Sequence, residues 1–459
     1  MDDNKTSNNG NLNQNLHTKE DNLYLQEGSA KFLQTEQVFY NPAQKFNRDI
    51  SVDLINTFLE DYTTNKKNKI HLDNKEDTDN INENYSPKIL ECMAASGLRS
   101  IRYFNEIKKP KQIYINDISE KSVELIRKNL EINKISENDV KISQKDCNRL
   151  MFENKNFFDI IDIDPFGTCS PFLENAIKSV KNNGLLILTA TDTAVLCRDR
   201  VKCFLKYTTT IKKTPMCHEL ALRSLLSHVS KVAGVLECAI EPICSISVDF
   251  YVRVFVKIIK RKVTAKKNFE KNQNCLICSN CNYFQKNNLL DSIPIRKCII
   301  GKCLNKKRLE KYSNSEYCSF KVLGPVWGDK INCYEFLKKV KTENTRVQVF
   351  LNFLLTEIDS FLYFSLADVC STFSLNCTPL IEVMFCIKNM GFNVSLTHCK
   401  LNSIKTNIDY STLVDILIDM NGDKVKDYTE NKEVLEIMNK IPNKGQLFSK
   451  MGPLSLPKK

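Results

Sequence analysis

The sequence predicts an α/β fold, in which helices cover a parallel β-sheet, followed by a smaller α+β C-terminal domain. Between residues 88 and 260, short apolar segments alternate with amphipathic ones. Such alternation is typical of βαβ units, whose strands form one parallel sheet. Apolar and polar residues then alternate over 245–258, which predicts one long antiparallel strand that closes the sheet.

Five apolar segments are the predicted parallel strands: KILECMA, QIYIND, DVKIS, DIIDID and GLLILTAT. Between the second and third, Val123, Ile126 and Leu130 have helical spacing, and residues 119–133 open with Ser-x-x-Ser. Near the C-terminus, LADVCSTFSLNCTPLIEVMFCIKNMGFNVSLTH predicts two short helices, a turn and a strand led by glycine. That order is typical of a helix-turn-helix or winged-helix-like module.

The composition is that of a soluble globular protein, with 42% hydrophobic and 26% charged residues. The sequence has no apolar stretch near the roughly 20 residues that a bilayer span needs. Its start, MDDNKTSNNG, resembles no export or organelle signal. We therefore expect a protein of the nucleus or cytoplasm without membrane association, acting as a monomer.

One segment carries the whole positive charge. Residues 257–321 contain 16 Lys/Arg and 4 Asp/Glu, a surplus of 12 that equals the net charge of +12 for the chain. Such a block favours a polyanionic partner, nucleic acid before membrane. Interleaved aromatic residues would suit a folded RNA held mainly through phosphates: Phe269, Tyr283, Phe284 and Tyr312. The alternative is a solvated surface.

The same block holds two close cysteine pairs. Cys278 and Cys281 form a C-x2-C pair, and Cys298 and Cys303 follow as C-x4-C. In a chain whose 19 cysteines are otherwise unpatterned, these pairs predict a structural tetrahedral zinc site with four sulfur ligands. Cys275 and Cys318 compete as ligands, and buried thiols without metal are the alternative.

Acidic residues follow successive predicted strands. Asp117 ends the second strand, where its carboxylate could accept hydrogen bonds from ribose hydroxyls. Asp146 follows the third strand and could accept from an adenine amine beside the backbone of Cys147. The loop after the first strand, LECMAASGLRS, has small residues but neither a dinucleotide fingerprint nor a phosphate-binding loop. The pattern fits S-adenosylmethionine better than NAD, although each acid could also be a helix cap.

The fourth strand ends in DIDPFG, which places Asp164 beside Phe166. The exocyclic amine of a nucleobase is a poor nucleophile because its lone pair is delocalised into the ring. A carboxylate within hydrogen-bonding distance can orient the amine and take up its developing positive charge. A phenyl ring stacked on the base can hold the amine in line with a methyl donor. The alternative is that Asp164 only caps the next helix.

The chain resembles the tRNA (guanine-26) dimethyltransferase family over residues 25–415. The similarity rests on long stretches in the same order: EGSAKFLQTEQVFYNPAQKFNRDIS, AASGLRSIRY, YINDISEKSVELIRKNLEIN, DIDPFGTCSPFL, LTATDTAVLC, CHELALR, SVDFYVRVFVK, LGPVW and GFNVSLTH. The resemblance implies a class I, Rossmann-like methyltransferase domain and a family-specific C-terminal domain. It also implies transfer of one and then a second methyl to the exocyclic N2 amine of guanine 26 in tRNA.

The resemblance also assigns site residues. It implies cofactor-binding positions at Arg48, Arg99, Asp117, Asp146 and Cys147, with Arg48 offering its guanidinium fork to the methionine carboxylate. It implies Asp164 as the catalytic carboxylate, and Phe39 and Phe166 as rings that sandwich the guanine. Phe39 could instead be a core aromatic.

The resulting prediction divides the chain into five parts. A disordered tail (1–25) precedes a methyltransferase domain (26–265) with a low-complexity insertion (64–86), then the basic zinc module (266–323), a tRNA-binding domain (324–430) and a second tail (431–459). The single tryptophan, Trp327, is predicted to anchor domain packing. Two alternatives stay open: a methyltransferase for another RNA or protein amine, and a catalytically silent tRNA-binding protein.

Overall fold

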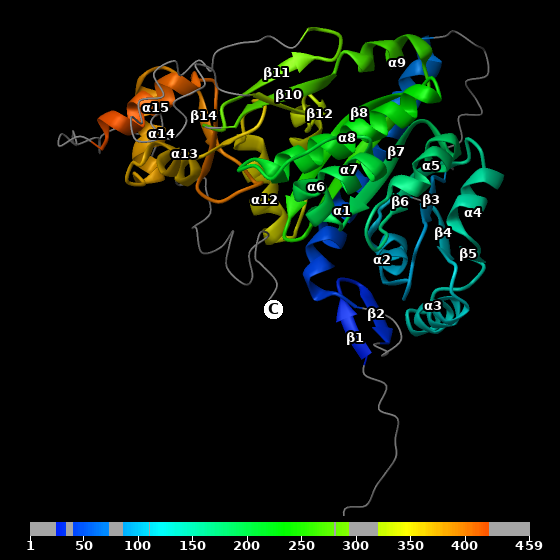
Figure 1. Cartoon of the computed structure of the whole chain (residues 1–459). Helices are drawn as coiled ribbons and strands as arrows, with labels where there is room; N and C mark the ends of the chain where they lie inside the picture. Colours follow the sequence, from blue (N-terminus) through cyan, green and yellow to red (C-terminus); the bar gives the residue numbers. More distant parts are fainter. Residues whose placement is uncertain are drawn as a thin grey trace, which may run out of the picture.

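The computed structural model describes residues 24–33, 40–72, 86–109, 111–279, 281–292 and 320–421, with side chains up to residue 62 in the first helix. Figure 1 shows a central β-sheet with helices on both faces and a C-terminal module beside it. Of the helices within these residues, none is long and apolar enough to cross a membrane.

The central sheet has seven strands in the order β5-β4-β3-β6-β7-β9-β8. The first five in that order are parallel, and β9 is antiparallel to both β7 and β8. The strands are β3 (Lys88–Glu91), β4 (Gln112–Asp117), β5 (Val140–Gln144), β6 (Phe158–Ile163), β7 (Val180–Ala190), β8 (Ala239–Val248) and β9 (Tyr251–Ile259). The predicted parallel α/β sheet is confirmed.

The single long strand predicted over 245–258 is wrong. Val248 of β8 pairs with Tyr251 of β9, so the chain reverses at Asp249 and Phe250. Asp249 has φ of 50°, a left-handed conformation that aspartate tolerates and that a continuous strand does not contain. The two strands therefore form a hairpin at the edge of the sheet.

Helices pack on both faces because successive side chains of each strand point to opposite sides. On one face, Ile89, Ile160 and Ile187 contact the helices before and around the first strands. These helices are α1 (Lys45–Leu72), α2 (Leu98–Glu106) and α3 (Glu120–Ile132). The helix predicted over 119–133 is thus confirmed, and the Ser119 side chain caps it by accepting from Ser122 N.

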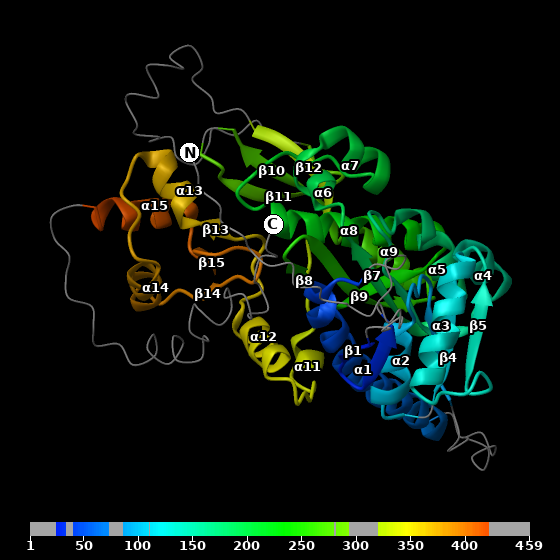
Figure 2. The same cartoon turned by 90° about the horizontal axis from the view of Figure 1, so that it is seen from below.

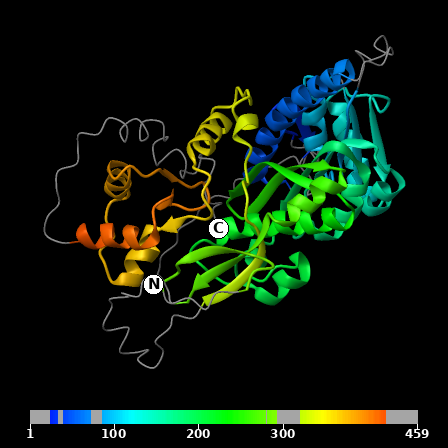
Figure 3. The ribbon, with the colours of Figure 1, turned by 90° about the horizontal axis from the view of Figure 1, so that it is seen from above.

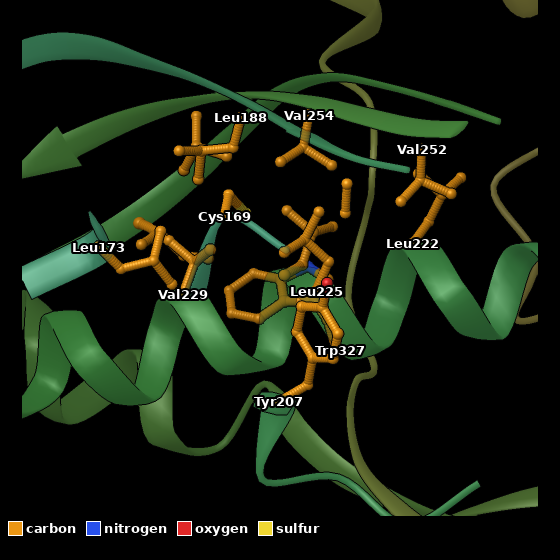
Figure 4. Close-up of a cluster of buried hydrophobic side chains, with 14 of the residues drawn as sticks. Cys169, Leu173, Leu188, Tyr207, Leu222, Leu225, Val229, Val252, Val254 and Trp327 are labelled. Atoms are coloured by element: carbon orange, nitrogen blue, oxygen red, sulfur yellow. The ribbon is translucent and has the colours of Figure 1, made fainter. Parts of the chain in front are cut away.

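The other face is covered mainly by α8 (Cys217–Val235). Figure 4 shows side chains of this helix, among them Leu225 and Val229, against Leu188 of β7 and Val254 of β9. Each fully buried side chain of this size contributes about 1.5–3 kcal/mol. The other helices of the sheet domain are α4 (Cys147–Glu153), α5 (Leu173–Ser179), α6 (Thr193–Arg198), α7 (Arg200–Tyr207) and α9 (Lys262–Phe269).

A small antiparallel sheet packs on α8. Its strands, in the order β11-β10-β12, are β11 (Phe284–Asn288), β10 (Asn272–Cys278) and β12 (Phe320–Trp327). Trp327 ends β12, is completely buried, and lies in the same core cluster as the α8 side chains (Figure 4). Its predicted packing role is confirmed. The predicted boundary between residues 323 and 324 falls inside β12.

The C-terminal module has a three-stranded sheet, β13-β15-β14, and short helices. Figure 3 shows it, in orange and red, at one side of the sheet domain. Its elements are β13 (Phe364–Ser365), α13 (Leu366–Phe373), α14 (Leu380–Asn389), β14 (Val394–Leu396), β15 (Ser403–Thr406) and α15 (Tyr410–Asp419), reached through α11 (Tyr334–Leu337) and α12 (Thr345–Thr356). The two predicted short helices and the strand after glycine are confirmed.

Candidate active site

The parallel strands end at one edge of the sheet, where doubly wound folds bind their ligands. The loop after β3 turns sharply there, with Ala95 at φ of 50° and Gly97 at φ of 75°. A Cβ on Gly97 would lie 3.2 Å from Ile126 Cγ1, so glycine allows α2 and α3 to approach closely. Asn116 joins two neighbouring loops, since its amide donates to Cys92 O at 3.0 Å and to Lys145 O at 2.9 Å.

Asp117 lies at the end of β4 and is fixed by two backbone donors. Its Oδ2 accepts from Ala95 N at 2.8 Å, and its Oδ1 accepts from Ser119 N at 2.9 Å. The side chain is half-buried. Each carboxylate oxygen has a further lone pair, so this rigid carboxylate can still accept from two hydroxyl groups of a ribose.

Asp146 is exposed and caps α4, because its Oδ1 accepts from Arg149 N at 3.0 Å. The helix-cap alternative is therefore present in the structure, and Asp146 Oδ2 makes no hydrogen bond with the part of the chain that the structure describes. The next residue, Cys147, has a buried side chain in the core, which leaves its backbone as the group that a base could contact.

Asp164 follows β6 and forms an ion pair with Arg99, whose Nη2 donates to Asp164 Oδ2. The Arg99 guanidinium also reaches Asp162 Oδ2, at 3.2 Å from Nη1, and Glu91 Oε1, at 3.5 Å from Nε. Within the described residues, Asp164 Oδ1 makes no hydrogen bond, and the side chain is 20% exposed. Arg99 therefore orients Asp164 through Oδ2 and leaves Oδ1 without a hydrogen bond among the described residues.

Behind Asp164 lies a buried cluster of charged residues. Asp162 Oδ2 accepts from Arg253 Nη2 at 2.8 Å and from Tyr103 OH at 2.6 Å. Burial acts to raise the pKa of Asp162, but the charges of Arg253 and Arg99 outweigh it and hold the pKa below its usual range. Burial raises the pKa of Glu91 to about 8, so this carboxyl is protonated at neutral pH.

Phe166 lies in the loop that follows Asp164, and 89% of its surface is exposed. The loop is fixed to the end of β7 by two hydrogen bonds: Gly167 N donates to Thr191 Oγ1 at 2.7 Å, and Thr191 N donates to Gly167 O at 2.9 Å. Gly167 has φ of 95°. A rigid backbone thus presents an exposed aromatic ring two residues from the carboxylate.

Arg48 makes contacts that the sequence does not foretell. Its guanidinium fork binds Glu27 bidentately, with Nε to Oε1 at 2.6 Å and Nη2 to Oε2 at 2.5 Å. Glu27 ends β1 (Tyr24–Glu27), which pairs with β2 (Ala30–Leu33), so the pair ties this hairpin to α1. The proposed contact of Arg48 with a methionine carboxylate stays a prediction. Phe39 lies outside the described residues.

The predicted zinc ligands are described only in part. Cys278 ends β10 and Cys281 lies in the turn to β11; both are buried. Cys298, Cys303 and the competitor Cys318 lie outside the described residues. The other competitor, Cys275, is buried in the core of the sheet domain.

A different group could also hold a metal ion. The ligand atoms of Cys197, Cys217 and His218 lie within 4.8 Å of one another. Cys197 lies in α6, and the other two residues begin α8. No short metal-binding motif marks them in the sequence, since Cys197 lies 20 residues before Cys217.

Sequence reasoning also missed Glu91 and Arg253 as neighbours of the site. Both are charged residues that are buried among the apolar residues of their strands, and such residues need a charged partner. Asp162 gave the same signal within IIDID. Pairing these residues requires the strand order, which the sequence alone does not provide.

Known proteins are similar to this chain in sequence and in structure. The family model described as N2,N2-dimethylguanosine tRNA methyltransferase matches residues 18–418. A tRNA (guanine(26)-N(2))-dimethyltransferase of Schizosaccharomyces pombe is 36% identical over 443 residues, covering 86% of this chain and 80% of that protein. A Saccharomyces cerevisiae protein, named tRNA (guanine(26)-N(2))-dimethyltransferase, mitochondrial, is 32% identical over 453 residues, covering 86% and 78%.

A solved structure is also similar to this chain. Trm1 from Pyrococcus horikoshii, in complex with S-adenosyl-L-methionine, matches with a TM-score of 0.70 and 25% identity, covering 86% of this chain and 99% of that one. The residues matched by the family model include the sheet, the site and nearly all of the C-terminal module. The chain therefore belongs to the N2,N2-dimethylguanosine tRNA methyltransferase family.

Proposed function

We propose that this chain transfers methyl groups from S-adenosylmethionine to the N2 amine of guanine 26 in tRNA, first one and then a second. The observation that carries the proposal is Asp164, a partly exposed carboxylate fixed by Arg99 and followed by the exposed ring of Phe166. The names of the relatives support the position of the guanine and the dimethyl product.

The residues at the strand ends fit the cofactor. Asp117 is held by two backbone donors and can accept from the ribose hydroxyls. Asp146 keeps one carboxylate oxygen for the adenine amine. The tight loop at Ala95 and Gly97 leaves backbone rather than bulky side chains beside Asp117. When bound, S-adenosylmethionine supplies an electrophilic methyl group on a sulfonium.

Asp164 is the hydrogen-bond acceptor and the base for the guanine amine. Its Oδ1 accepts a hydrogen bond from the guanine N2–H and orients the nitrogen toward the methyl carbon. As the N–C bond forms and the S–C bond breaks, positive charge develops on nitrogen and the carboxylate stabilises it. Asp164 then accepts the proton and releases it to water. Arg99 keeps the carboxylate in place throughout, and Phe166 stacks on the base.

A test that separates this function from its alternatives uses two tRNA transcripts, one with guanine and one with adenine at position 26. After incubation with protein and S-adenosylmethionine, nucleoside mass spectrometry should detect N2-methyl- and then N2,N2-dimethylguanosine in the first transcript only. Methylation of both transcripts at another nucleoside would indicate another RNA amine as substrate. Binding without any methyl transfer would indicate the silent tRNA-binding protein.

We further propose a structural zinc ion held by Cys278, Cys281, Cys298 and Cys303. Support comes from the burial of the first two residues around one tight turn, where Cys278 N donates to Tyr283 O at 2.8 Å. Metal analysis of the purified protein should find one zinc per chain, lost in Cys278→Ser and kept in Cys217→Ser. The reverse result would assign the metal to the Cys197 group.

Location and oligomeric state also stay predictions. We expect a monomer in the nucleus or cytoplasm, although the S. cerevisiae relative carries "mitochondrial" in its name. Imaging of the tagged protein and analytical ultracentrifugation test the two expectations.

A further inference from the structure

A basic surface lies on α7 and the segment that follows it. Residues 198–213 contain six Lys/Arg and one aspartate. Five of the cations are exposed: Arg198 ends α6, and the other four, Arg200, Lys202, Lys212 and Lys213, lie on α7 or after it. On the same helix, Phe204 is 53% exposed and Leu205 is 73% exposed. We call the last four cations, together with Phe204 and Leu205, the α7 surface; Figure 2 shows α6 and α7 beside the β10–β12 sheet.

The α7 surface is anchored next to the catalytic loop. Asp192 Oδ1 accepts from Tyr207 OH at 2.5 Å, and Asp192 Oδ2 forms an ion pair with Lys206 at 3.0 Å. The preceding residue, Thr191, holds Gly167 in the loop of Phe166. Two adjacent residues at the end of β7 therefore fix α7 on one side and the catalytic loop on the other.

The first part of the basic block 257–321 lies elsewhere. Val252 of β9 pairs with Ala190, next to the catalytic edge, whereas Lys257 pairs with Leu185. Five residues of strand correspond to about 17 Å, so β9 leads away from the site. Asn268 of α9 accepts from Ile240 N, at the start of β8. The helix α9 therefore lies near the ends of the strands that are opposite to the catalytic site. Those lysines cannot contact a nucleotide bound at Asp164.

Two lysine side chains beside α7 lie close to each other. Lys212 lies next to Lys321 of β12, and the neighbouring ammonium lowers the pKa of Lys212. The two segments are held together by Thr210 and Gly324, whose backbones exchange hydrogen bonds of 2.8 Å. Repulsion between fixed like charges is relieved when an anion binds between them.

We propose that the α7 surface is where tRNA docks, with its phosphates on the four cations and an unstacked base or ribose against Phe204. This inference rests on the proposed function, since the polyanion is the RNA that brings its guanine to Asp164. Exposed aromatic rings between cations suit RNA because rings stack on bases while cations pair with phosphates.

The test compares two triple variants that remove the same charge. One is Arg200→Gln, Lys202→Gln, Lys213→Gln on the α7 surface; the control is Arg261→Gln, Lys266→Gln, Lys267→Gln near the opposite ends of the strands. All six side chains are exposed, so both proteins should fold. Fluorescence anisotropy with a labelled tRNA transcript, over a series of salt concentrations, gives the affinity and its salt dependence.

We expect the α7 triple variant to bind tRNA roughly tenfold more weakly or worse, with a salt slope smaller by about 0.9 per lost phosphate contact. The control should stay within about twofold of the wild type. Phe204→Ala should weaken binding by about tenfold and keep the salt slope, since stacking is not ionic. Equal affinity of wild type and the α7 triple variant would overturn the proposal, as would a larger loss in the control.

The proposed function is tested separately in the same preparations. Wild-type protein that methylates guanine 26, together with an α7 triple variant of unchanged affinity, refutes only the docking surface. Wild-type protein that binds tRNA but makes no N2-methylguanosine refutes the proposed function, while the comparison of the variants still locates the RNA-binding surface.

Discussion

Two clusters of buried charge differ in the balance of their groups. The sheet-edge cluster, behind the catalytic loop, has three carboxylates and two guanidiniums: Glu91, Asp162, Asp164, Arg99 and Arg253. The α8 cluster joins α8 to the C-terminal module and has two carboxylates and three basic groups: Glu219, Glu357, Arg223, His398 and Lys405.

The balance decides which carboxylates ionise. Burial raises the pKa of Glu91 to about 8. The charge of Arg99 acts to lower this pKa, but Arg99 also interacts with Asp162 and Asp164, whose negative charges act to raise it. Burial also acts to raise the pKa of Glu357, but the charges of His398 and Lys405 outweigh it and hold that pKa far below its usual range. The sheet-edge cluster therefore keeps a proton on Glu91, whereas Glu357 in the α8 cluster is ionised.

The clusters also differ in access. Every side chain in the α8 cluster is at most 3% exposed, whereas Asp164 is 20% exposed and ends the sheet-edge cluster at the surface. A closed cluster can only hold elements together. An open one can present a charged oxygen to a ligand while its buried members keep that oxygen in place.

The largest expected effect is on stability, in Lys405→Met. Lys405 Nζ lies 3.1 Å from Glu219 Oε1 and 3.0 Å from Glu357 Oε1. Removing one partner from a buried ionic group leaves uncompensated charge and costs about 3–5 kcal/mol. Chemical denaturation should show this loss in the free energy of unfolding, and the folded variant should still bind S-adenosylmethionine.

Lys400→Met is the matched control, because Lys400 pairs with Asp368 at 2.7 Å near the surface. Exposed pairs contribute about 0–1 kcal/mol. A Lys405→Met protein as stable as the Lys400→Met protein would show that the α8 cluster does not hold the module.

Asp164→Asn should affect activity rather than stability: methyl transfer should be lost while the free energy of unfolding changes little. The amide keeps a carbonyl oxygen for Arg99 but cannot accept the proton of the amine. Loss of such a positioned base costs on the order of 100-fold or more in rate. Single-turnover methylation measures this, with thermal unfolding as the control. Turnover within fivefold of wild type, in a folded variant, would remove Asp164 from the mechanism.

Part of this contrast was predictable from sequence. Asp117, Asp146 and Asp164 are predictable because each lies at or just after the end of a strand, and parallel strands end at one edge of the sheet. The pairing of Arg99 with Asp164 was not found, since it depends on how α2 packs against β6. The turn at Asp249 was missed because alternation continues across it, and only its positive φ reveals the hairpin.

The next effect concerns the cofactor. Asp117→Ala removes the acceptor for the ribose and also releases Ala95 N and Ser119 N from the carboxylate. Hydrogen bonds to a charged group contribute about 1.5–3 kcal/mol, so affinity for S-adenosylmethionine should fall roughly 10- to 100-fold. Isothermal titration calorimetry measures it, and tRNA affinity should not change. Unchanged cofactor affinity would exclude the ribose contact.

The smallest effect is a pH dependence that comes from Glu91 in the sheet-edge cluster. Glu91 has an ordinary pKa of 4.5 when unfolded and about 8 when folded. Between these values the folded state holds a proton that the unfolded state has released, so the contribution of Glu91 to stability falls as pH rises through this window. The slope is at most about 1.4 kcal/mol per pH unit.

Glu91→Gln removes this titration and keeps the shape of the side chain. Denaturation of both proteins at pH 6 and pH 7 should show the variant gaining stability relative to wild type by about 1 kcal/mol over that unit. The α8 cluster adds its own pH dependence in this range: burial acts to lower the pKa of His398, but Cys399 and Glu357 outweigh it and hold that pKa well above its ordinary value of 6.5. Both proteins keep His398, so this contribution cancels in the difference between Glu91→Gln and wild type. If that difference is constant, Glu91 is ionised in the folded protein. The sheet-edge cluster would then carry three negative charges against two positive ones. Its contrast with the α8 cluster would not lie in a protonated carboxyl group.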